Sequence, residues 1–203
     1  MFHMKNRIEV FIVIGFLTLG SGCALTQERV KLSYAPQIGA PKVEKADTAI
    51  VTVAVVDSRT TKDKVSAKEN AFGMKMAPIT SEENVSSLLK EAIEVELEHR
   101  GFQLGAGKAL VLVELAKFEN DFKQGFFSGD AVAEFFMSVK VKEVTGQVLY
   151  TKFIEGKGLN SGIQLASGSN AKIALDAALK DAVAKLFQEP QFLESIVKAG
   201  TGT

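Results

Sequence analysis

The sequence predicts an α+β fold: a mainly antiparallel four-stranded sheet with two long helices packed on one face. Three observations point to it, namely an apolar stretch at residues 49–57, two long stretches with helical periodicity, and an alternating stretch at 131–141 that leads into a tight turn. In chain order the elements read β-α-β-β-β-α, followed by a short C-terminal helix. We expect a single domain over residues 48–203.

The first expected strand is AIVTVAVVD, residues 49–57, which is apolar on both faces as a central strand should be. Residues 58–79 show no clean period and contain Gly73 and Pro78. They are therefore expected to form a long loop, in which one short strand around residues 72–76 has room.

The first helix is expected to begin at the capping-box pattern of Thr80 and Glu83. Apolar residues then recur at the spacing of one buried stripe: Val85, Leu88, Leu89, Ala92 and Ile93. Gly101 is placed to end this helix in a left-handed cap, over which Phe102 closes.

Three further strands are expected after this helix. The first is ALVLVELAKF, residues 109–118. Over residues 131–141 apolar and polar side chains alternate, which predicts a strand with one wet face. Thr145 and Gly146 then turn the chain into VLYTKFI, residues 148–154, to make an antiparallel hairpin.

The second long helix is expected to follow a glycine-rich loop. Four glycines at residues 156–168 predict that loop, which ends near a cap at Ser169 or Asn170. The helix should run to about Phe187, and Pro190 ends it, with a short final helix beyond. Its apolar stripe consists of Leu175, Ala178, Leu179, Ala182, Val183 and Leu186.

Residues 1–22 have the pattern of a secretory signal peptide. Lys5 and Arg7 stand in a start without acidic residues, ten apolar residues follow at 10–19, and small residues at 20–22 precede Cys23. The apolar run is shorter than the roughly 20 residues that a membrane-spanning helix needs. A buried core helix would leave the basic start and the small-residue exit unexplained.

The stretch LTLGSGCAL resembles the lipobox of bacterial lipoproteins, in which a cysteine follows small residues at the end of the signal peptide. The resemblance implies cleavage between Gly22 and Cys23, and attachment of diacylglycerol and a further acyl chain, such as palmitate, to Cys23. Each buried CH₂ contributes about 0.8 kcal/mol, so several chains make a lasting anchor. The family usually has Leu, Val or Ile where this chain has Gly20. A cleaved protein with a free thiol is the alternative.

The residue after the cysteine bears on localisation. In the lipoprotein family an Asp there often signals retention in the inner membrane, and this chain has Ala24. The resemblance therefore implies a lipid-anchored protein of the cell envelope, in the outer membrane and facing the periplasm.

Residues 23–47 are expected to be the lipidated cysteine and a flexible tether, because they are polar and punctuated by Pro36, Gly39 and Pro41. As a coil this stretch would span about 25–30 Å. Its segment KLSYAP, residues 31–36, has one aromatic side chain that can instead dock on the domain.

The composition argues against several classes of function. The 24 basic and 24 acidic residues balance, so no charge excess favours nucleic acid as a partner. One cysteine and two histidines are too few for a disulfide framework or a Cys/His zinc site. His99, at a helix end, is expected to interact with the terminal carbonyls. With no phosphate-loop, metalloprotease or nucleophile-elbow motif, we expect no catalytic residue, metal or cofactor, and no enzyme.

Four residues are candidates for contact with a partner. Asp57 and Arg59 follow the first buried strand, where such a charged pair is either solvated, paired internally or used for binding. Phe126 and Phe127 of GFFSGD lie in an expected turn. Their rings either fold back onto the core or form a contact surface for a protein or a membrane.

The chain as a whole resembles the YajG-type lipoproteins, a family of small bacterial envelope lipoproteins. The resemblance rests on the lipobox, on TVAVVDSRT (52–60), on SLLKEAIEVELEHRGF (87–102) and on FLESIVKA (192–199). It implies a fold and a location but no mechanism, because these stretches are mostly core and cap positions.

We therefore expect a lipid-anchored bacterial envelope lipoprotein that is non-catalytic and acts as a structural or accessory protein through contacts with an envelope protein. The alternative is a small-ligand binding module that holds a lipid, glycan or peptide between sheet and helices. A deep apolar pocket not filled by Phe135, Met137 or Leu179 would favour that alternative. An envelope hydrolase would instead require clustered acids of raised pKa around one pocket.

Overall fold

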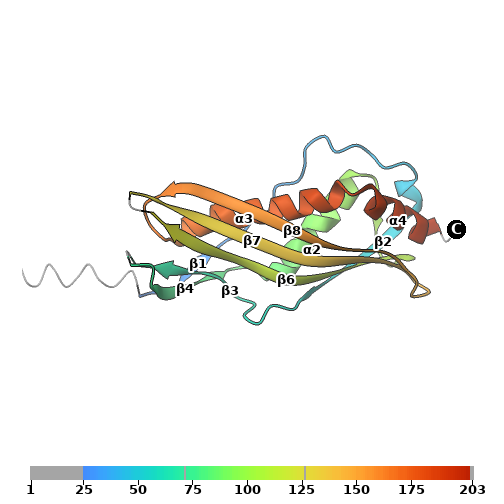
Figure 1. The fold of residues 1–203 in the computed structure, drawn as a ribbon. Coiled ribbons are helices and arrows are strands. Elements are labelled where there is room, and N and C mark those ends of the chain that lie inside the picture. The colour runs from blue at the N-terminus through green and yellow to red at the C-terminus, as the bar shows by residue number, and fades with distance from the viewer. Residues whose placement is uncertain (1–24, 71, 126, 202–203) are drawn as a thin grey trace, which may run out of the picture.

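The computed structural model describes residues 25–70, 72–125 and 127–201 (Figure 1). The expected signal peptide, Gly22, Cys23 and Phe126 lie outside these residues. The described chain forms the helices α2 (Val85–His99), α3 (Gly168–Phe187) and α4 (Pro190–Thr201), with a short 3₁₀ helix, η1 (Ala46–Thr48). Its two sheets confirm the α+β class.

The larger sheet has five strands in the order β5-β2-β6-β7-β8. These strands are β5 (Gln103–Leu104), β2 (Ile50–Asp57), β6 (Ala109–Gln124), β7 (Gly129–Glu143) and β8 (Val148–Ile163). β2 runs parallel to β5 and β6, while β6, β7 and β8 are antiparallel. The four-stranded sheet predicted from the sequence is therefore not what forms, because two-residue β5 adds a strand too short to show a period.

The long strands continue well beyond their predicted ends. The register of β6 and β7 shifts between Leu115 and Lys117, which marks a β-bulge. Because the extra residue reverses the alternation, Phe118 still points into the core, and β6 runs six residues past the predicted end at 118. A pattern read with strict period two loses its alternation at this bulge, so the predicted strand ends shortly after it.

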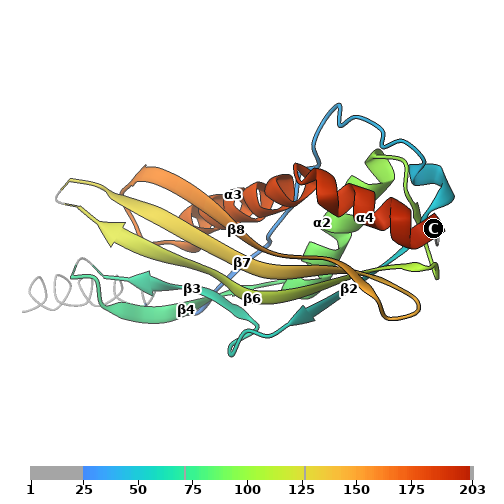
Figure 2. The ribbon, with the colours of Figure 1, turned by 45° about the vertical axis from the view of Figure 1, so that its right-hand side comes forward.

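A second sheet forms where the sequence predicts a long loop at residues 58–79. Its strands, in the order β1-β4-β3, are β1 (Glu28–Val30), β4 (Lys75–Ser81) and β3 (Lys64–Glu69). Register shifts interrupt the pairing of β3 with β4, which explains the missing period. Ser66 of β3 donates a hydrogen bond to the carbonyl of Asn120 in β6, 2.8 Å away. One of the two sheets curls into a half-barrel, and β3 of the smaller sheet contacts β6 of the larger one (Figure 2).

The first long helix begins later than the capping-box pattern predicts. Thr80 belongs to β4, and the cap of α2 is Asn84, whose side chain accepts a hydrogen bond from the Ser87 amide. The predicted end is confirmed. Gly101 has a φ of 97°, and the Phe102 amide donates to the Leu97 carbonyl at 3.1 Å.

The glycine-rich stretch before α3 is largely strand, which corrects the predicted loop. β8 extends to Ile163, and Gly156 and Gly158 lie directly beneath α3. A Cβ at Gly158 would lie 1.9 Å from the Ala174 carbonyl oxygen, and one at Gly156 would lie 2.3 Å from that of Ala178. These glycines therefore let the helix approach the strand closely.

The ends of the C-terminal helices differ in detail from the expectation. Ser167, and not Ser169 or Asn170 as predicted, caps α3, and α3 ends at Phe187 as predicted. Pro190 both follows α3 and opens α4, where its fixed φ and missing N–H are tolerated. α4 continues to Thr201, beyond the short final helix expected.

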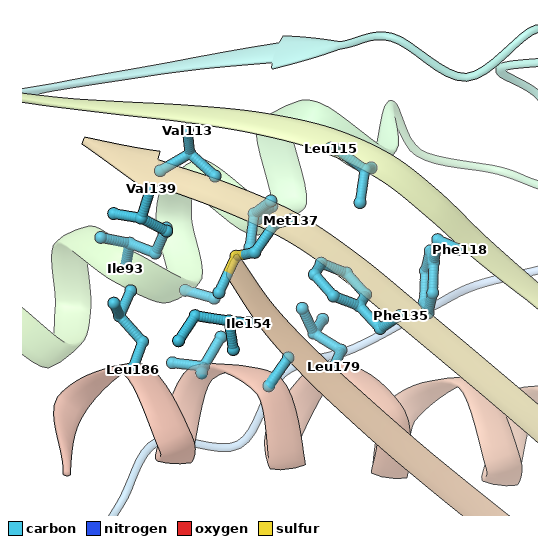
Figure 3. Packing of buried hydrophobic residues seen from close by; sticks show 14 of the residues in the cluster. Ile93, Val113, Leu115, Phe118, Phe135, Met137, Val139, Ile154, Leu179 and Leu186 are labelled. Carbon is cyan, nitrogen blue, oxygen red and sulfur yellow. The ribbon is translucent and has the colours of Figure 1, made fainter. Parts of the chain in front are cut away.

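The core lies between the five-stranded sheet and the helices, which cover one of its faces (Figures 1 and 3). Phe118 and Phe135 meet edge to face with ring centroids 5.1 Å apart. Phe135, Met137 and Leu179 are at most 1% exposed and point into the same space. A ligand-binding module would need a pocket between the sheet and the helices. These three side chains fill that space.

Part of the segment expected to be a flexible tether is packed on the domain. β1 pairs with β4, and Leu32 is 3% exposed. Tyr34 hydrogen-bonds to Glu96 of α2, so the aromatic side chain of KLSYAP docks as the sequence allowed. No helix within the described residues is long and apolar enough to cross a membrane.

Candidate functional site

Asp57 and Arg59, two of the predicted contact residues, are buried and paired with each other. Their side chains are 7% and 6% exposed, and the ion pair measures 2.7 Å. Arg59 also donates to the carbonyls of Phe118 and Lys62, at 3.1 and 2.5 Å. Burial opposes ionisation of Asp57, but the hydrogen bonds from Arg59 hold its pKa below the usual value. The pair thus fixes the chain between β2 and β3 and leaves little surface for a partner.

A second buried ionic cluster joins the N-terminal segment to α2, and sequence reasoning missed it. Glu96, fully buried, accepts hydrogen bonds from the Tyr34 hydroxyl at 2.6 Å and the Gln37 amide at 2.7 Å. Arg100 pairs with the same carboxylate and donates to the Gln37 side chain at 2.7 Å. The Arg100 guanidinium also lies 4.4 Å from the ring centroid of Phe187.

The electrostatics of this cluster favour an ionised Glu96. Burial would raise the pKa of Glu96, but hydrogen bonds from Tyr34, Gln37 and Arg100 hold it below the usual value. Burial is the main cause that raises the pKa of the Tyr34 hydroxyl, and the hydrogen bond to Glu96 raises it further. The i,i+4 spacing of Glu96 and Arg100 was the one signal in the sequence, although that spacing is usually exposed.

The outer face of the five-stranded sheet, away from the helices, carries large apolar side chains in solvent. We call Val56, Leu112, Phe136, Phe153 and Leu159 the open sheet face. Val56, Phe153 and Leu159 are 61%, 82% and 60% exposed, although each lies within a strand. Lys117 extends over the Phe136 ring, with its Nζ 5.7 Å from the centroid.

Two hollows mark this face, with volumes of about 350 and 370 Å³. Glu114 and Ser138 line both of them, and the Glu114 carboxylate accepts a hydrogen bond from Ser58 at 2.8 Å. Phe136 and Phe153 line the first hollow, and Val56 lines the second. The face thus combines apolar side chains with a few fixed polar groups.

Phe127, the other described candidate residue, is 87% exposed beside a hollow of about 300 Å³. Its ring therefore does not fold back into the core. Glu69 also lines this hollow, and burial raises its pKa. Of the described residues that line the hollow, Glu69 is the only carboxylate, so the clustered acids that a hydrolase would require are not found there.

Among the residues that the structure describes, the remaining polar side chains form no recognisable reactive group. His99 is exposed in the last turn of α2. Within residues 25–70, 72–125 and 127–201, no three His, Cys, Asp or Glu side chains are placed to hold a metal ion.

Comparison with protein families gives one match over most of the chain. A family model described as "Uncharacterized lipoprotein" matches residues 36–196. No curated protein matches.

Comparison with solved structures gives matches at low identity, one of which shows a similar fold. Protein XCC0632 from Xanthomonas campestris has a TM-score of 0.58 at 11% identity, over 83% of this chain and 96% of that one. A minor lipoprotein from Acinetobacter baumannii (TM-score 0.44, 8% identity) covers 74% of this chain and 93% of its own. A putative lipoprotein from Caulobacter crescentus (0.42, 10%) covers 78% and 95%.

Proposed function

Because this chain belongs to a family of uncharacterized lipoproteins, we propose that it is a lipid-anchored, non-catalytic protein of the bacterial envelope that acts through contacts with another envelope protein. We further propose that it is a YajG-type lipoprotein, which the stretches at 52–60, 87–102 and 192–199 support. The lipobox-like stretch ending at Cys23 supports the anchor. Several acyl chains on that cysteine would hold the protein durably on a bilayer. Ala24, in place of the Asp that signals inner-membrane retention, supports an anchor in the outer membrane with the domain facing the periplasm.

The open sheet face is the observation that carries the accessory role. Phe153 and Leu159 of β8 and Val56 of β2 expose most of their surface, with Glu114 and Ser138 between them. Exposed apolar patches with interspersed polar groups are typical of protein interfaces. We assign the partner contact to this face, since Asp57 and Arg59 are largely occupied with each other.

Binding of a small ligand is less well supported. Phe135, Met137 and Leu179 occupy the space between sheet and helices in which such a ligand would lie. The hollows of about 300–370 Å³ on the described surface are partly open to solvent, whereas ligand sites usually enclose most of the ligand.

The anchor is tested with Cys23→Ser in the full-length protein. We expect the wild-type protein in the membrane fraction and the variant in the soluble periplasmic fraction, because serine cannot carry the thioether-linked lipid. Mass spectrometry of the wild-type N-terminus should find an acylated Cys23 as the first residue. A bare thiol on that residue would contradict the proposal.

The contact surface is tested by photo-crosslinking in intact cells. A photoreactive amino acid at Phe153 should capture one defined envelope protein, whereas the same probe at Val144 should not. Val144 is a matched control because it is also a large apolar residue, 72% exposed, in the turn between β7 and β8. Equal capture from both positions would count against the open sheet face.

A further inference from the structure

We propose that one end of the fold rests on the bilayer that holds the N-terminal lipid, with the side chains of Phe72, Met74, Phe127 and Leu165 inserted into its interface. We call these four residues the loop end. They lie on the β3–β4, β6–β7 and β8–α3 connections, which meet at one end of the half-barrel (Figures 1 and 2). The inference rests on the lipid anchor of the proposed function and adds a second membrane contact to it.

The loop end exposes more apolar surface than a soluble turn requires. Phe72 and Phe127 are each 87% exposed, Leu165 is 72% exposed and Met74 is 56% exposed. Aromatic and aliphatic side chains in such positions gain free energy only when they meet an apolar surface, such as the boundary between headgroups and acyl chains.

Hydrogen bonds hold the loops in place. The Asn70 side chain accepts from the amides of Phe72 and Met74 at 2.9 and 3.0 Å. Gln124, at the end of β6, donates to the Asn70 carbonyl at 2.6 Å. Asn70, Phe127 and Leu165 line the same hollow, so all three connections face one side.

The direction of β1 places the anchor near this end. β1 runs parallel to β4, and β4 begins at Lys75, directly after the β3–β4 turn. The chain preceding Glu28 therefore leads toward the loop end, and Leu25 there is 64% exposed. Gln27 holds this direction through a hydrogen bond to Thr80 at 2.9 Å.

The length of chain between β1 and the cysteine is short. Glu28 pairs with Ile79, which lies four residues from Lys75, or about 13 Å along the strand. The five residues from Glu28 back to Cys23 span at most about 17 Å. An acylated Cys23 can thus reach only slightly past the loop end, so the domain cannot stand clear of the bilayer.

Charge does not account for the contact. Lys75 pairs with Asp121 at 3.0 Å, and Lys68 pairs with Glu28 at 3.3 Å. Lys123 lines the same hollow as the carboxylate of Glu69, so acidic side chains balance the basic ones here and leave no excess charge to attract anionic lipids. If apolar side chains insert, the contact between the loop end and the bilayer should persist in zwitterionic phosphatidylcholine, which has no net charge, and at high salt.

The test uses the full-length acylated protein in phosphatidylcholine vesicles. Cys23 is the only native cysteine and its thiol is consumed by lipid, so Phe127→Cys, Leu165→Cys, Val144→Cys and Val148→Cys each add a single reactive thiol. Each thiol is labelled with an environment-sensitive fluorophore. Val144 and Val148 are matched controls because they are exposed apolar residues around the β7–β8 turn, at the other end of these strands.

We expect the emission at 127 and 165 to shift to the blue and to be largely quenched by spin-labelled lipids that report a depth of about 5–10 Å. The emission at 144 and 148 should stay as in water, and added NaCl should change neither result. When Phe127→Asp is combined with Leu165→Cys, the fluorophore at position 165 should lose most of its quenching by the spin-labelled lipids.

Two outcomes overturn the inference, and they are distinguishable. If the protein floats with the vesicles but the labels at 127 and 165 remain as in water, the anchor stands and the loop end does not touch lipid. If Cys23 itself takes up the label and the protein stays in solution, the anchor of the proposed function has failed.

Discussion

The two faces of the five-stranded sheet differ in how far their large apolar side chains are buried. Phe135 on β7 and Phe153 on the adjacent β8 are the same residue type, yet they are 0% and 82% exposed. Phe135 lies beneath α3, whereas the Phe153 ring is largely in solvent. The covered face holds the fold together, and the open one has no comparable role in the core.

What makes the faces differ is the small-residue contact between β8 and α3. Gly156 and Gly158 lie against Ala174, Ala178 and Ala182. Without side chains between them, the strand and the helix come close enough to exclude water from the long apolar residues on either side. A sheet with Leu at both glycines could not seat α3 in this way.

The largest expected effect separates the two phenylalanines directly. Phe135→Ala should lower the free energy of unfolding by about 3–5 kcal/mol, because it leaves a cavity in a packed core. Phe153→Ala should change it by at most about 0.5 kcal/mol, since the ring is already in water. Urea denaturation measures both values, and similar losses would contradict the assignment of the faces.

The covered side also contains the ionic cluster of Glu96. Arg100→Ala should cost about 3–5 kcal/mol, because it leaves the buried carboxylate without its cation. The matched control is Lys90→Ala, which breaks the more exposed i,i+4 pair with Glu94 and should cost at most about 0.5 kcal/mol. A small loss for Arg100→Ala in urea denaturation would show that water reaches the cluster.

A smaller effect is expected from one methyl group beneath α3. Gly158→Ala should destabilise the protein by about 1–3 kcal/mol, since the added Cβ would lie 1.9 Å from the Ala174 carbonyl oxygen and force helix and strand apart. Leu159→Ala, one residue later on the open sheet face, should have little effect. Thermal unfolding of both variants distinguishes a close helix–strand contact from a loop that tolerates alanine.

The smallest effect is a pH dependence specific to the covered side. The folded-state pKa of Glu96 lies below its ordinary value of 4.5, so its contribution to stability is complete above about pH 4.5. It is lost as the pH falls from there through the lowered folded-state value. Urea denaturation from pH 7 to pH 3 should therefore show a steeper loss for the wild-type protein than for Glu96→Gln. Parallel curves would mean that Glu96 does not titrate against this cluster.

Much of the fold could be predicted because its signals are local. The stripe of α2 and its end at Gly101, the alternation within β7, and the end of α3 at Phe187 each follow from periodicity or caps within a few residues. The bulge at Leu115 and the irregular pairing of β3 with β4 have no such local signal, because a register shift breaks the period-two alternation from which a strand is recognised.

The candidate site was predicted less completely. Phe127 is exposed, as the prediction of a contact surface at GFFSGD requires. Asp57 and Arg59 are mainly paired with each other. The open sheet face was missed, because the exposure of Phe153 depends on which face the helices cover, and the strand pattern alone does not say which.

The sequence by itself determined the α+β class, both long helices and the resemblance to lipoproteins, since these depend on periods, caps and a contiguous lipobox-like stretch. Only the tertiary structure decided that Gly156 and Gly158 seat a helix, that Tyr34 and Gln37 bind Glu96, and that three separate turns meet at one end. The physical reason is that a buried contact between distant segments depends on how the elements pack, and no pattern within either segment records it.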